Sequence, residues 1–206
     1  MSMRLRFLAR QFARPGGLIG RWLIAPWLDR ISREQNSLVL ERLAIAPGDR
    51  VLEVGFGGGG LLAMMLARDA RDLIGVDPSE AALARARRRF RGKELQLLAG
   101  TVEALPLPAA GADKAASVNS LYFWEDLPAA LVEIGRVLRP GGTLVLGWES
   151  PEMLRKWPGY RYGFHVRTAD EVIAAAAGAG FGEPKPETVN GFHLLSLRRR
   201  ADMEAP

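Results

Sequence analysis

Residues 51–60 read VLEVGFGGGG, a short β-rich run that ends in a cluster of glycines. Residues 60–67 follow at once and predict a buried helix, because almost all of their side chains are apolar. Glycine has no Cβ, so a strand that passes through such a loop into a helix leaves its backbone open to a ligand. The stretch therefore predicts a ligand-binding strand–loop–helix unit.

Two carboxylates accompany this unit. Asp77 stands about 20 residues after Gly55, at the end of a strand predicted for residues 73–76. A carboxylate at that place can accept hydrogen bonds from the two hydroxyls of a ribose. Glu53 comes two residues before the first glycine, where a carboxylate suits a cationic group and repels a pyrophosphate.

Strands and helices alternate along most of the chain. The predicted strands are residues 50–54, 73–76, 95–98, 115–119 and 143–147. The predicted helices are residues 60–67 and 80–91, one from the cap Asp126 to the stop at Pro140-Gly141-Gly142, and one from the capping box of Thr168 and Glu171. Two strand candidates, around Thr188 and over residues 193–197, predict an antiparallel hairpin. The expected fold is α/β: a Rossmann-like, doubly wound, mainly parallel seven-stranded sheet with an antiparallel C-terminal strand.

The composition narrows the class of protein. The 206 residues suit one domain with a short extension, and 25% charged residues are ordinary for a globular chain. There is no cysteine and there are only two histidines, so we expect no disulfide, no cysteine nucleophile and no metal site. No run of 18 apolar residues exists, and the N-terminus lacks the features of a targeting segment. We therefore expect a cytoplasmic protein.

The glycine loop alone leaves two cofactors open. Gly55, Gly57 and Gly60 also satisfy the dinucleotide fingerprint. Against a dinucleotide stand the carboxylate of Glu53 and the short chain after residue 147, which leaves little room for the substrate domain that many dehydrogenases carry.

The region 47–147 resembles the class I S-adenosylmethionine-dependent methyltransferases. It is most similar to the small-molecule type, the "methyltransferase type 11"-like domain that includes ubiquinone- and sterol-methylating enzymes. The resemblance rests on the glycine loop and on the segments Asp77-Pro78-Ser79, Glu103-Ala104-Leu105-Pro106 and Leu138-Arg139-Pro140-Gly141-Gly142. About half of the chain carries it.

The resemblance implies S-adenosylmethionine as the cofactor and assigns roles to residues. The methionine half and the sulfonium would contact Glu53, Gly55, Phe56, Gly57 and Gly59. The ribose would lie at Asp77 and its neighbour Pro78, and the adenine beside Thr101, Val102 and Glu103. Similar families often carry an aspartate where Thr101 stands, and a threonine makes a weaker contact. Asn119, Ser120 and Leu121 would face the methionine and the acceptor.

The absence of cysteine and of two prolines after Asn119 argues against several classes of methyl-transfer reaction. A chain without cysteine can neither methylate cytosine at C5 nor hold the iron–sulfur cluster of the radical enzymes. The segment Asn119-Ser120-Leu121-Tyr122 lacks the two prolines that enzymes for exocyclic amines of nucleic acid bases or for protein glutamine typically have there. This argues against that subclass.

Tyr122 and His165 are the catalytic candidates. Tyr122 opens an aromatic run with Phe123 and Trp124, whose faces could surround a sulfonium or an apolar acceptor, although the latter two could equally be core. His165 lies in the crossover 158–167, which often covers the acceptor pocket in the similar family. Its imidazole could act as a base near neutral pH, or it could be a plain surface residue.

The expected reaction is methyl transfer to a small, lipophilic acceptor. The alternatives are an RNA methyltransferase, suggested by the net charge of +5 and the arginines of residues 85–91, and a non-catalytic cofactor-binding protein with the same fold. No RNA-binding module is visible, so nucleic acid is the weaker partner.

The domain division places an N-terminal helical extension at residues 1–36, the methyltransferase domain at 37–200 and a tail at 201–206. The extension is basic and apolar, and Gly16-Gly17 and Pro26 interrupt it. We expect a lid over the acceptor pocket; the alternatives are a peripheral membrane contact and a helix packed permanently on the domain.

Overall fold

Seven strands form one sheet in the computed structural model, which describes residues 32–68, 70–157, 160–161 and 163–201. The strands are β1 (Arg50–Val54), β2 (Asp72–Asp77), β3 (Gln96–Ala99), β4 (Ala112–Val118), β5 (Leu138–Glu149), β6 (Phe181–Val189) and β7 (Phe192–Arg199). Their order is β3-β2-β1-β4-β5-β7-β6. The pairs from β3 to β5 are parallel, and β7 runs antiparallel to both neighbours. The predicted mainly parallel sheet and C-terminal hairpin are confirmed.

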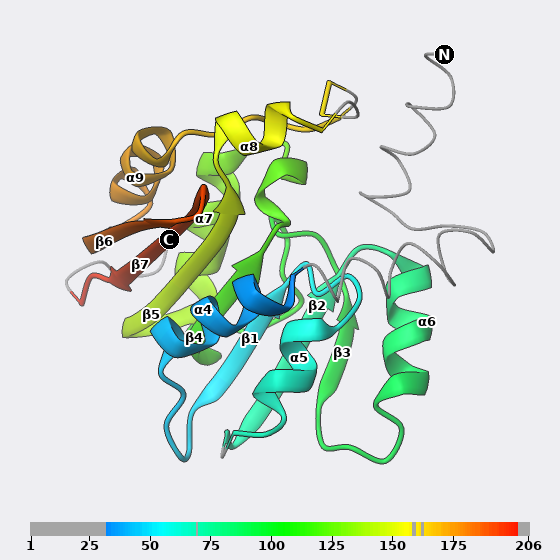
Figure 1. Cartoon of the computed structure of the whole chain (residues 1–206). Helices are drawn as coiled ribbons and strands as arrows, with labels where there is room; N and C mark the ends of the chain where they lie inside the picture. The colour runs from blue at the N-terminus through cyan, green and yellow to red at the C-terminus, as the bar shows by residue number, and fades with distance from the viewer. Residues whose placement is uncertain (1–31, 69, 158–159, 162, 202–206) are drawn as a thin grey trace.

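Helices cover both faces of this sheet (Figure 1). The described helices are α4 (Arg33–Leu43), α5 (Gly60–Met65), α6 (Glu80–Arg89), the 3₁₀ turn η2 (Leu121–Phe123), α7 (Leu127–Val137), α8 (Pro151–Arg155) and α9 (Ala169–Gly178). One apolar cluster lies on each face of the sheet. Helices α4, α5 and α6 pack in one cluster, and α7 and α9 pack in the other. Consecutive residues of β1 alternate between them, as Val51 and Leu52 show, because side chains of a strand point to opposite faces.

The predicted helix starts agree with the capping hydrogen bonds. Asp126 accepts from the backbone N–H of Ala129 at 2.9 Å. Thr168 accepts from the N–H of Glu171 at 3.2 Å, while the Glu171 carboxylate accepts from the N–H of Thr168 at 2.7 Å. Both ends of this capping box are therefore formed, and α9 begins where it was expected.

Two strands begin earlier than predicted. β5 starts at Leu138, because the backbone becomes extended there and Leu138 pairs with Ala112, so Pro140-Gly141-Gly142 lies within the strand. β6 starts at Phe181 and includes Pro184 and Pro186. An edge strand tolerates proline because one row of its N–H groups has no ladder partner, and β6 is at the edge of the sheet.

The predicted boundary between residues 36 and 37 falls inside α4, which begins at Arg33. Val39, Leu40 and Leu43 of this helix are buried, and Asn36 is only 4% exposed. Residues 33–36 are thus packed with the domain rather than separate from it. The rest of the extension, residues 1–31, and residues 202–206 of the tail lie outside the described residues, and so does the predicted lid.

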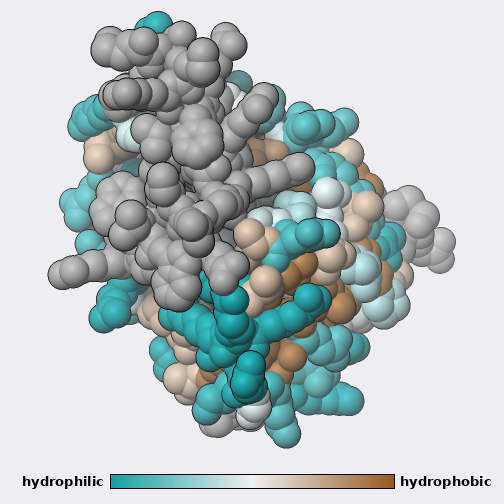
Figure 2. Space-filling model, turned by 90° about the vertical axis from the view of Figure 1, so that its right-hand side faces the viewer, coloured by the Kyte–Doolittle hydropathy of each residue, from teal (hydrophilic) through white to brown (hydrophobic). Residues whose placement is uncertain are grey.

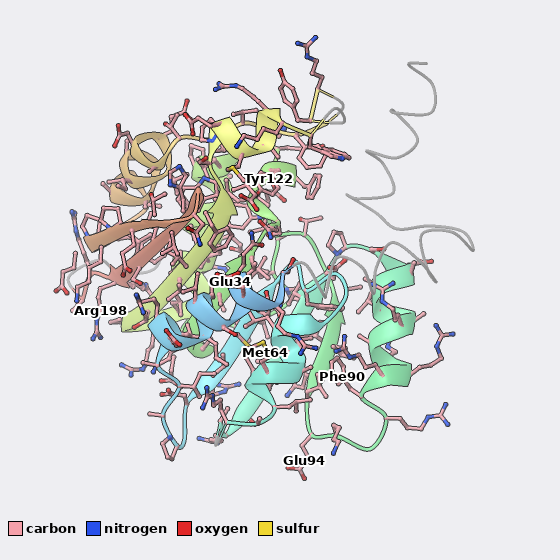
Figure 3. All side chains as sticks on the ribbon, viewed as in Figure 1. Glu34, Met64, Phe90, Glu94, Tyr122 and Arg198 are labelled. Carbon is pink, nitrogen blue, oxygen red and sulfur yellow. The ribbon has the colours of Figure 1, made fainter. Side chains whose placement is uncertain are left out.

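The carboxyl ends of β1, β2, β4 and β5 lie at one edge of the sheet. Tyr122 is at this edge, and Glu94 is at the opposite end of the molecule (Figure 3). Within the described part of the chain, no helix has the length and apolar character needed to cross a membrane.

Candidate functional site

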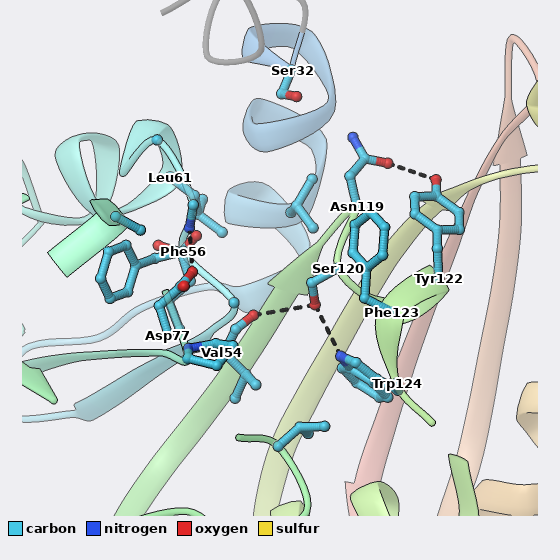
Figure 4. A pocket seen from close by; sticks show the side chains of 18 of the residues that line it. Ser32, Val54, Phe56, Leu61, Asp77, Asn119, Ser120, Tyr122, Phe123 and Trp124 are labelled. Atoms are coloured by element: carbon cyan, nitrogen blue, oxygen red, sulfur yellow. Dashed lines mark hydrogen bonds between the residues drawn. The ribbon is translucent and has the colours of Figure 1, made fainter. Parts of the chain in front are cut away.

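A cavity of 790 Å³ opens at the carboxyl edge of the sheet. Its volume is in the range of small-molecule sites, and it lies where parallel α/β sheets place their ligands. One side, called here the glycine-loop side, is formed by residues 53–58, 60–61, 76–78 and 100–103. The other, called the aromatic side, is formed by Gln35, Asn119, Tyr122, Phe123, Glu149, Met153, Leu154, Trp157 and Phe164. Figure 4 shows Asp77 and Phe56 on the first side, and Tyr122 and Phe123 on the second.

The glycine loop adopts a backbone that other residues rarely allow. Gly55, Gly57 and Gly59 have φ values of +73°, +49° and +76°. A Cβ on Gly55 would lie 2.6 Å from the Cβ of Ser120, so the loop packs directly against the end of β4. A Cβ on Gly57 would meet nothing within 4 Å. Only glycine suits both positions, and open space lies beside Gly57.

Asp77 holds the loop from the end of β2. Its Oδ2 accepts from the N–H of Gly57 at 2.8 Å, and its Oδ1 accepts from the N–H of Ser79 at 2.8 Å. The side chain is 6% exposed and lines the cavity. Both carboxylate oxygens of Asp77 thus accept backbone hydrogen bonds at the rim of the cavity.

Two arginines of α6 bind the loop from its other side. Arg85 donates to the carbonyl of Gly57 at 2.6 Å, and Arg89 donates to the carbonyl of Gly58 at 2.8 Å. Figure 2 views the molecule from the side that carries α6 and shows hydrophilic residues interspersed with hydrophobic ones. Part of the arginine-rich helix thus has a structural role at the loop and needs no nucleic acid to explain it.

Glu53 completes the glycine-loop side at the end of β1. It is 3% exposed and lines the cavity beside Gly55 and Gly57. Across from it, Thr101, Val102 and Glu103 form a tight turn closed by a bridge between Thr101 and Ala104. Glu133 of α7 accepts from the N–H of Leu105 at 2.8 Å and so anchors the segment after this turn.

Ser120 joins the two sides. Its hydroxyl donates to the carbonyl of Val54 at 3.4 Å and accepts from the indole N–H of Trp124 at 3.1 Å (Figure 4). It also shares a short hydrogen bond with Ser117. The residue before it, Asn119, has a φ of +53°, a left-handed conformation that asparagine tolerates better than most residues.

The aromatic side contains a continuous chain of polar side chains. Gln35 donates to Oε1 of Glu149 at 2.6 Å and accepts from the amide of Asn119 at 2.6 Å. The hydroxyl of Tyr122 donates to Oδ1 of Asn119 at 2.8 Å and accepts from the backbone N–H of Glu149. The chain connects α4, the end of β4, η2 and the end of β5.

The protonation states of this chain follow from its burial. Tyr122 is 3% exposed, and burial raises the pKa of its phenol far above the ordinary value. The phenol therefore stays protonated at neutral pH and is unsuited to be a base. Burial also raises the pKa of Glu149, and the hydrogen bond from Gln35 partly offsets this.

Most of the predicted site residues line the cavity. These are Glu53, Gly55, Phe56, Gly57, Asp77, Pro78, Thr101, Val102, Glu103, Asn119, Ser120 and Tyr122. Their positions follow from strand ends that meet at one edge of a parallel sheet, which is why the sequence could locate them.

Three predicted residues lie elsewhere. Leu121 is 2% exposed and packs in the apolar core, because η2 turns its side chain away from the cavity. Gly59 is the N-cap residue before α5 and lies against the ring of Phe90, whereas its neighbours Gly58 and Gly60 line the cavity. His165 is exposed and does not line the cavity; its backbone N–H donates to the carbonyl of Tyr122 at 2.8 Å. The structure therefore does not bring these three residues to the cavity.

Several lining residues were not predicted. Glu149 carried a signal, since it is a polar residue at the end of a parallel strand, as Asp77 is. Gln35, Trp157 and Phe164 carried none, because only tertiary packing brings α4 and the segment after α8 to this edge. No group of three metal-ligating side chains occurs among the described residues.

The comparisons with known proteins agree with this geometry. The family model described as "Methyltransferase domain" matches residues 52–146. An uncharacterized methyltransferase of Bacillus subtilis, YdaC, is 40% identical over 118 residues, which are 57% of this chain and 65% of that protein. The chain spans about a third of the length of two further curated relatives.

Solved methyltransferases share the fold. An S-adenosylmethionine-dependent methyltransferase from Mesorhizobium loti superposes with a TM-score of 0.71 at 22% identity, over 79% of this chain and 96% of that one. Geranyl diphosphate C-methyltransferase from Streptomyces coelicolor superposes with a TM-score of 0.69 at 18% identity, over 82% and 77%. Residues 52–146 thus match the methyltransferase-domain family, and the chain has the fold of the class I S-adenosylmethionine-dependent methyltransferases.

Proposed function

We propose that this protein binds S-adenosylmethionine in the cavity and transfers its methyl group to a small molecule. The observation that carries the proposal is the meeting of a buried carboxylate, an open glycine loop and a second carboxylate within one cavity. These are Glu53, the loop at Gly57 and Asp77.

The residues present fit the parts of this cofactor. The buried carboxylate of Glu53 suits the positive charges of the methionine half and disfavours a pyrophosphate. The open space at Gly57 admits a ligand against the backbone. The carboxylate of Asp77 lines the cavity and suits the ribose hydroxyls as a charged acceptor, and the turn of Thr101, Val102 and Glu103 would border the adenine, with Pro78 beside Asp77.

The protein's part in the transfer is to position the acceptor and exclude water. When bound, the cofactor supplies a methyl group that is activated by the positive charge of its sulfur. Asn119 and Tyr122 on the aromatic side, together with Ser120, which joins the two sides, would fix the acceptor relative to that methyl group. Such alignment can lower the activation free energy of the transfer by several kcal/mol. Tyr122 would act here by holding Asn119, and His165 lies outside the cavity.

The acceptor side favours a molecule without phosphate groups. No lysine, arginine or histidine is among the described residues that line the cavity, whereas six carboxylates are. The Streptomyces coelicolor neighbour is named for geranyl diphosphate. An acceptor of that kind would bring its charges toward carboxylates here, and the same holds for the backbone of RNA.

Calorimetry and a transfer assay test the proposal. The full chain is titrated with S-adenosylmethionine, S-adenosylhomocysteine and NAD, and is then incubated with methyl-labelled S-adenosylmethionine and pools of small metabolites or RNA. We expect saturable binding of the first two ligands and label in the small-molecule pool. Saturable binding of NAD alone would overturn the cofactor assignment, and label confined to RNA would overturn the acceptor class.

A further inference from the structure

The aromatic side of the cavity contains one carboxylate, that of Glu149. Gln35 donates to its Oε1 at 2.6 Å. Among the described residues, no donor and no basic side chain contacts its Oε2. The side chain is partly buried and lines the cavity, so this oxygen is placed to accept a hydrogen bond from a ligand.

Aromatic rings surround this region. The rings of Phe123 and Phe164 are 4.7 Å apart between centroids, and those of Trp157 and Phe164 are 5.0 Å apart. Tyr122 lies 5.6 Å from Phe164. Aromatic faces attract cations and also pack against apolar groups, so the wall suits a ligand that combines a cation with an apolar body.

The charges of the residues that line the cavity also favour a cationic ligand. The whole chain carries a net charge of +5, yet the described lining of the cavity contains six carboxylates and no basic side chain. Three of these, Glu53, Asp77 and Glu103, are on the glycine-loop side. Two more, Glu125 and Asp126, follow Trp124, and Glu149 is the carboxylate of the aromatic side. An anionic ligand would meet repulsion throughout the cavity.

The burial of Glu149 favours an ion pair between its carboxylate and a cationic ligand. Burial raises the pKa of this carboxyl because its charged form is less well solvated there than in water. A cation that binds beside it restores favourable electrostatics, and the partly water-excluded surroundings strengthen the pair.

We propose that the aromatic side binds an acceptor that carries a protonated aliphatic amine next to an apolar body, and that Glu149 selects it by accepting a hydrogen bond from the ammonium group. The inference names the acceptor class for the function proposed above and rests on it. An aliphatic amine is cationic at neutral pH, unlike the exocyclic amines of nucleic acid bases.

Three probes with one common body test this selection: 2-phenylethylamine, 2-phenylethanol and 3-phenylpropanoate. Each is titrated into the full chain by calorimetry, with and without saturating S-adenosylhomocysteine. We expect the amine to bind at least about tenfold more tightly than the alcohol, and the carboxylate not to bind at millimolar concentration. Equal affinities, tighter binding of the carboxylate, or no binding of the amine would overturn the inference.

A matched pair of variants assigns the selection to Glu149. Glu149→Gln keeps a group that can accept from Gln35 but removes the charge, so we expect the preference for the amine to fall about tenfold or more. Glu152→Gln makes the same charge change at an exposed residue of α8 that does not line the cavity, and it should keep the preference. An amine preference that survives Glu149→Gln contradicts the proposal.

Two further measurements separate the causes of failure. Trp157→Leu should weaken the binding of the amine and of the alcohol to the same extent, because it removes part of the aromatic wall and leaves the carboxylate of Glu149 in place. Binding of S-adenosylhomocysteine to the unmodified chain is measured independently. If that binding is absent while the Glu149-dependent amine preference remains, the proposed function fails and the amine site stands; the reverse pattern overturns the amine site alone.

Discussion

The two sides of the cavity are built in different ways. The glycine-loop side is held mainly through backbone groups: Asp77 accepts from the N–H of Gly57, and Arg85 donates to its carbonyl. The aromatic side is held through side chains that contact each other, from Gln35 to Glu149, Asn119 and Tyr122. The first side uses residues close in sequence to strand ends, whereas the second joins segments that are far apart, such as α4 and β5.

This difference indicates how far each side of the cavity can change between related proteins. The loop contributes only backbone groups to these hydrogen bonds, so they depend little on the loop's own side chains except where glycine is required, and the same loop can serve many related proteins. A side-chain network depends on every member, and replacing one residue changes its shape and charge. We therefore expect the aromatic side to determine which acceptor this chain takes, and the glycine-loop side to bind what the whole family shares.

The largest effect should come from Gly57→Val. A β-branched residue is strained at a φ of +49°, and its side chain would occupy the open space where the cofactor is proposed to approach. We expect binding of S-adenosylhomocysteine to weaken more than about 100-fold in calorimetry. Gly92→Val is the matched control, because Gly92 has a φ of +75° and open space but does not line the cavity. If both variants lose binding equally, general strain rather than the loop is responsible.

A smaller effect is expected for Asp77→Asn. The amide keeps one acceptor oxygen but replaces the other, and it removes the charge that strengthens bonds to Gly57 and to ribose hydroxyls. A charged hydrogen bond contributes about 1.5–3 kcal/mol, so affinity for S-adenosylhomocysteine should fall about 10- to 100-fold. Asp72→Asn, on the same strand but outside the cavity, should leave the affinity as it is. Unchanged affinity in a folded Asp77→Asn protein argues against the ribose role.

Tyr122→Phe tests the other side of the comparison. It removes the hydroxyl that joins Asn119 to the N–H of Glu149 and leaves both groups without that partner. We expect the free energy of unfolding to fall by about 1–3 kcal/mol, while affinity for S-adenosylhomocysteine changes less than about threefold. Thermal or urea unfolding and calorimetry measure the two quantities. A large loss of cofactor affinity would show that the two sides are coupled more tightly than their separate construction suggests.

The smallest effect concerns the anchor beneath the glycine-loop side. Glu133 forms an ion pair with Arg136 at 2.7 Å and accepts from the N–H of Leu105, and these bonds, the one from Arg136 above all, lower its pKa. The stabilisation is thus present above the ordinary pKa of 4.5 and is lost as the pH falls through the lower folded value. Glu133→Gln should cost about 1 kcal/mol at pH 7 and less below pH 4. An equal cost at both pH values would contradict this account, and urea unfolding measures it.

The glycine-loop side could be predicted almost completely, because its signals are local. Residues 51–60 combine a strand pattern with obligatory glycines, and Asp77 ends the next strand. Leu121 was misplaced because the direction of a side chain in η2 depends on how that turn packs on the core. His165 was misplaced because its segment shows no periodic pattern that would fix its orientation.

The sequence by itself determined the alternation of strands and helices, the glycine loop and the edge of the sheet at which the cavity lies, since these follow from hydrophobic periodicity and from glycine's conformational freedom. Only the tertiary structure decided that Gln35 of α4 reaches Glu149 at the end of β5, and that Trp157 and Phe164 complete the wall. The physical reason is that these contacts join residues separated by 114 positions for the first pair, and no local pattern encodes which distant side chains will meet.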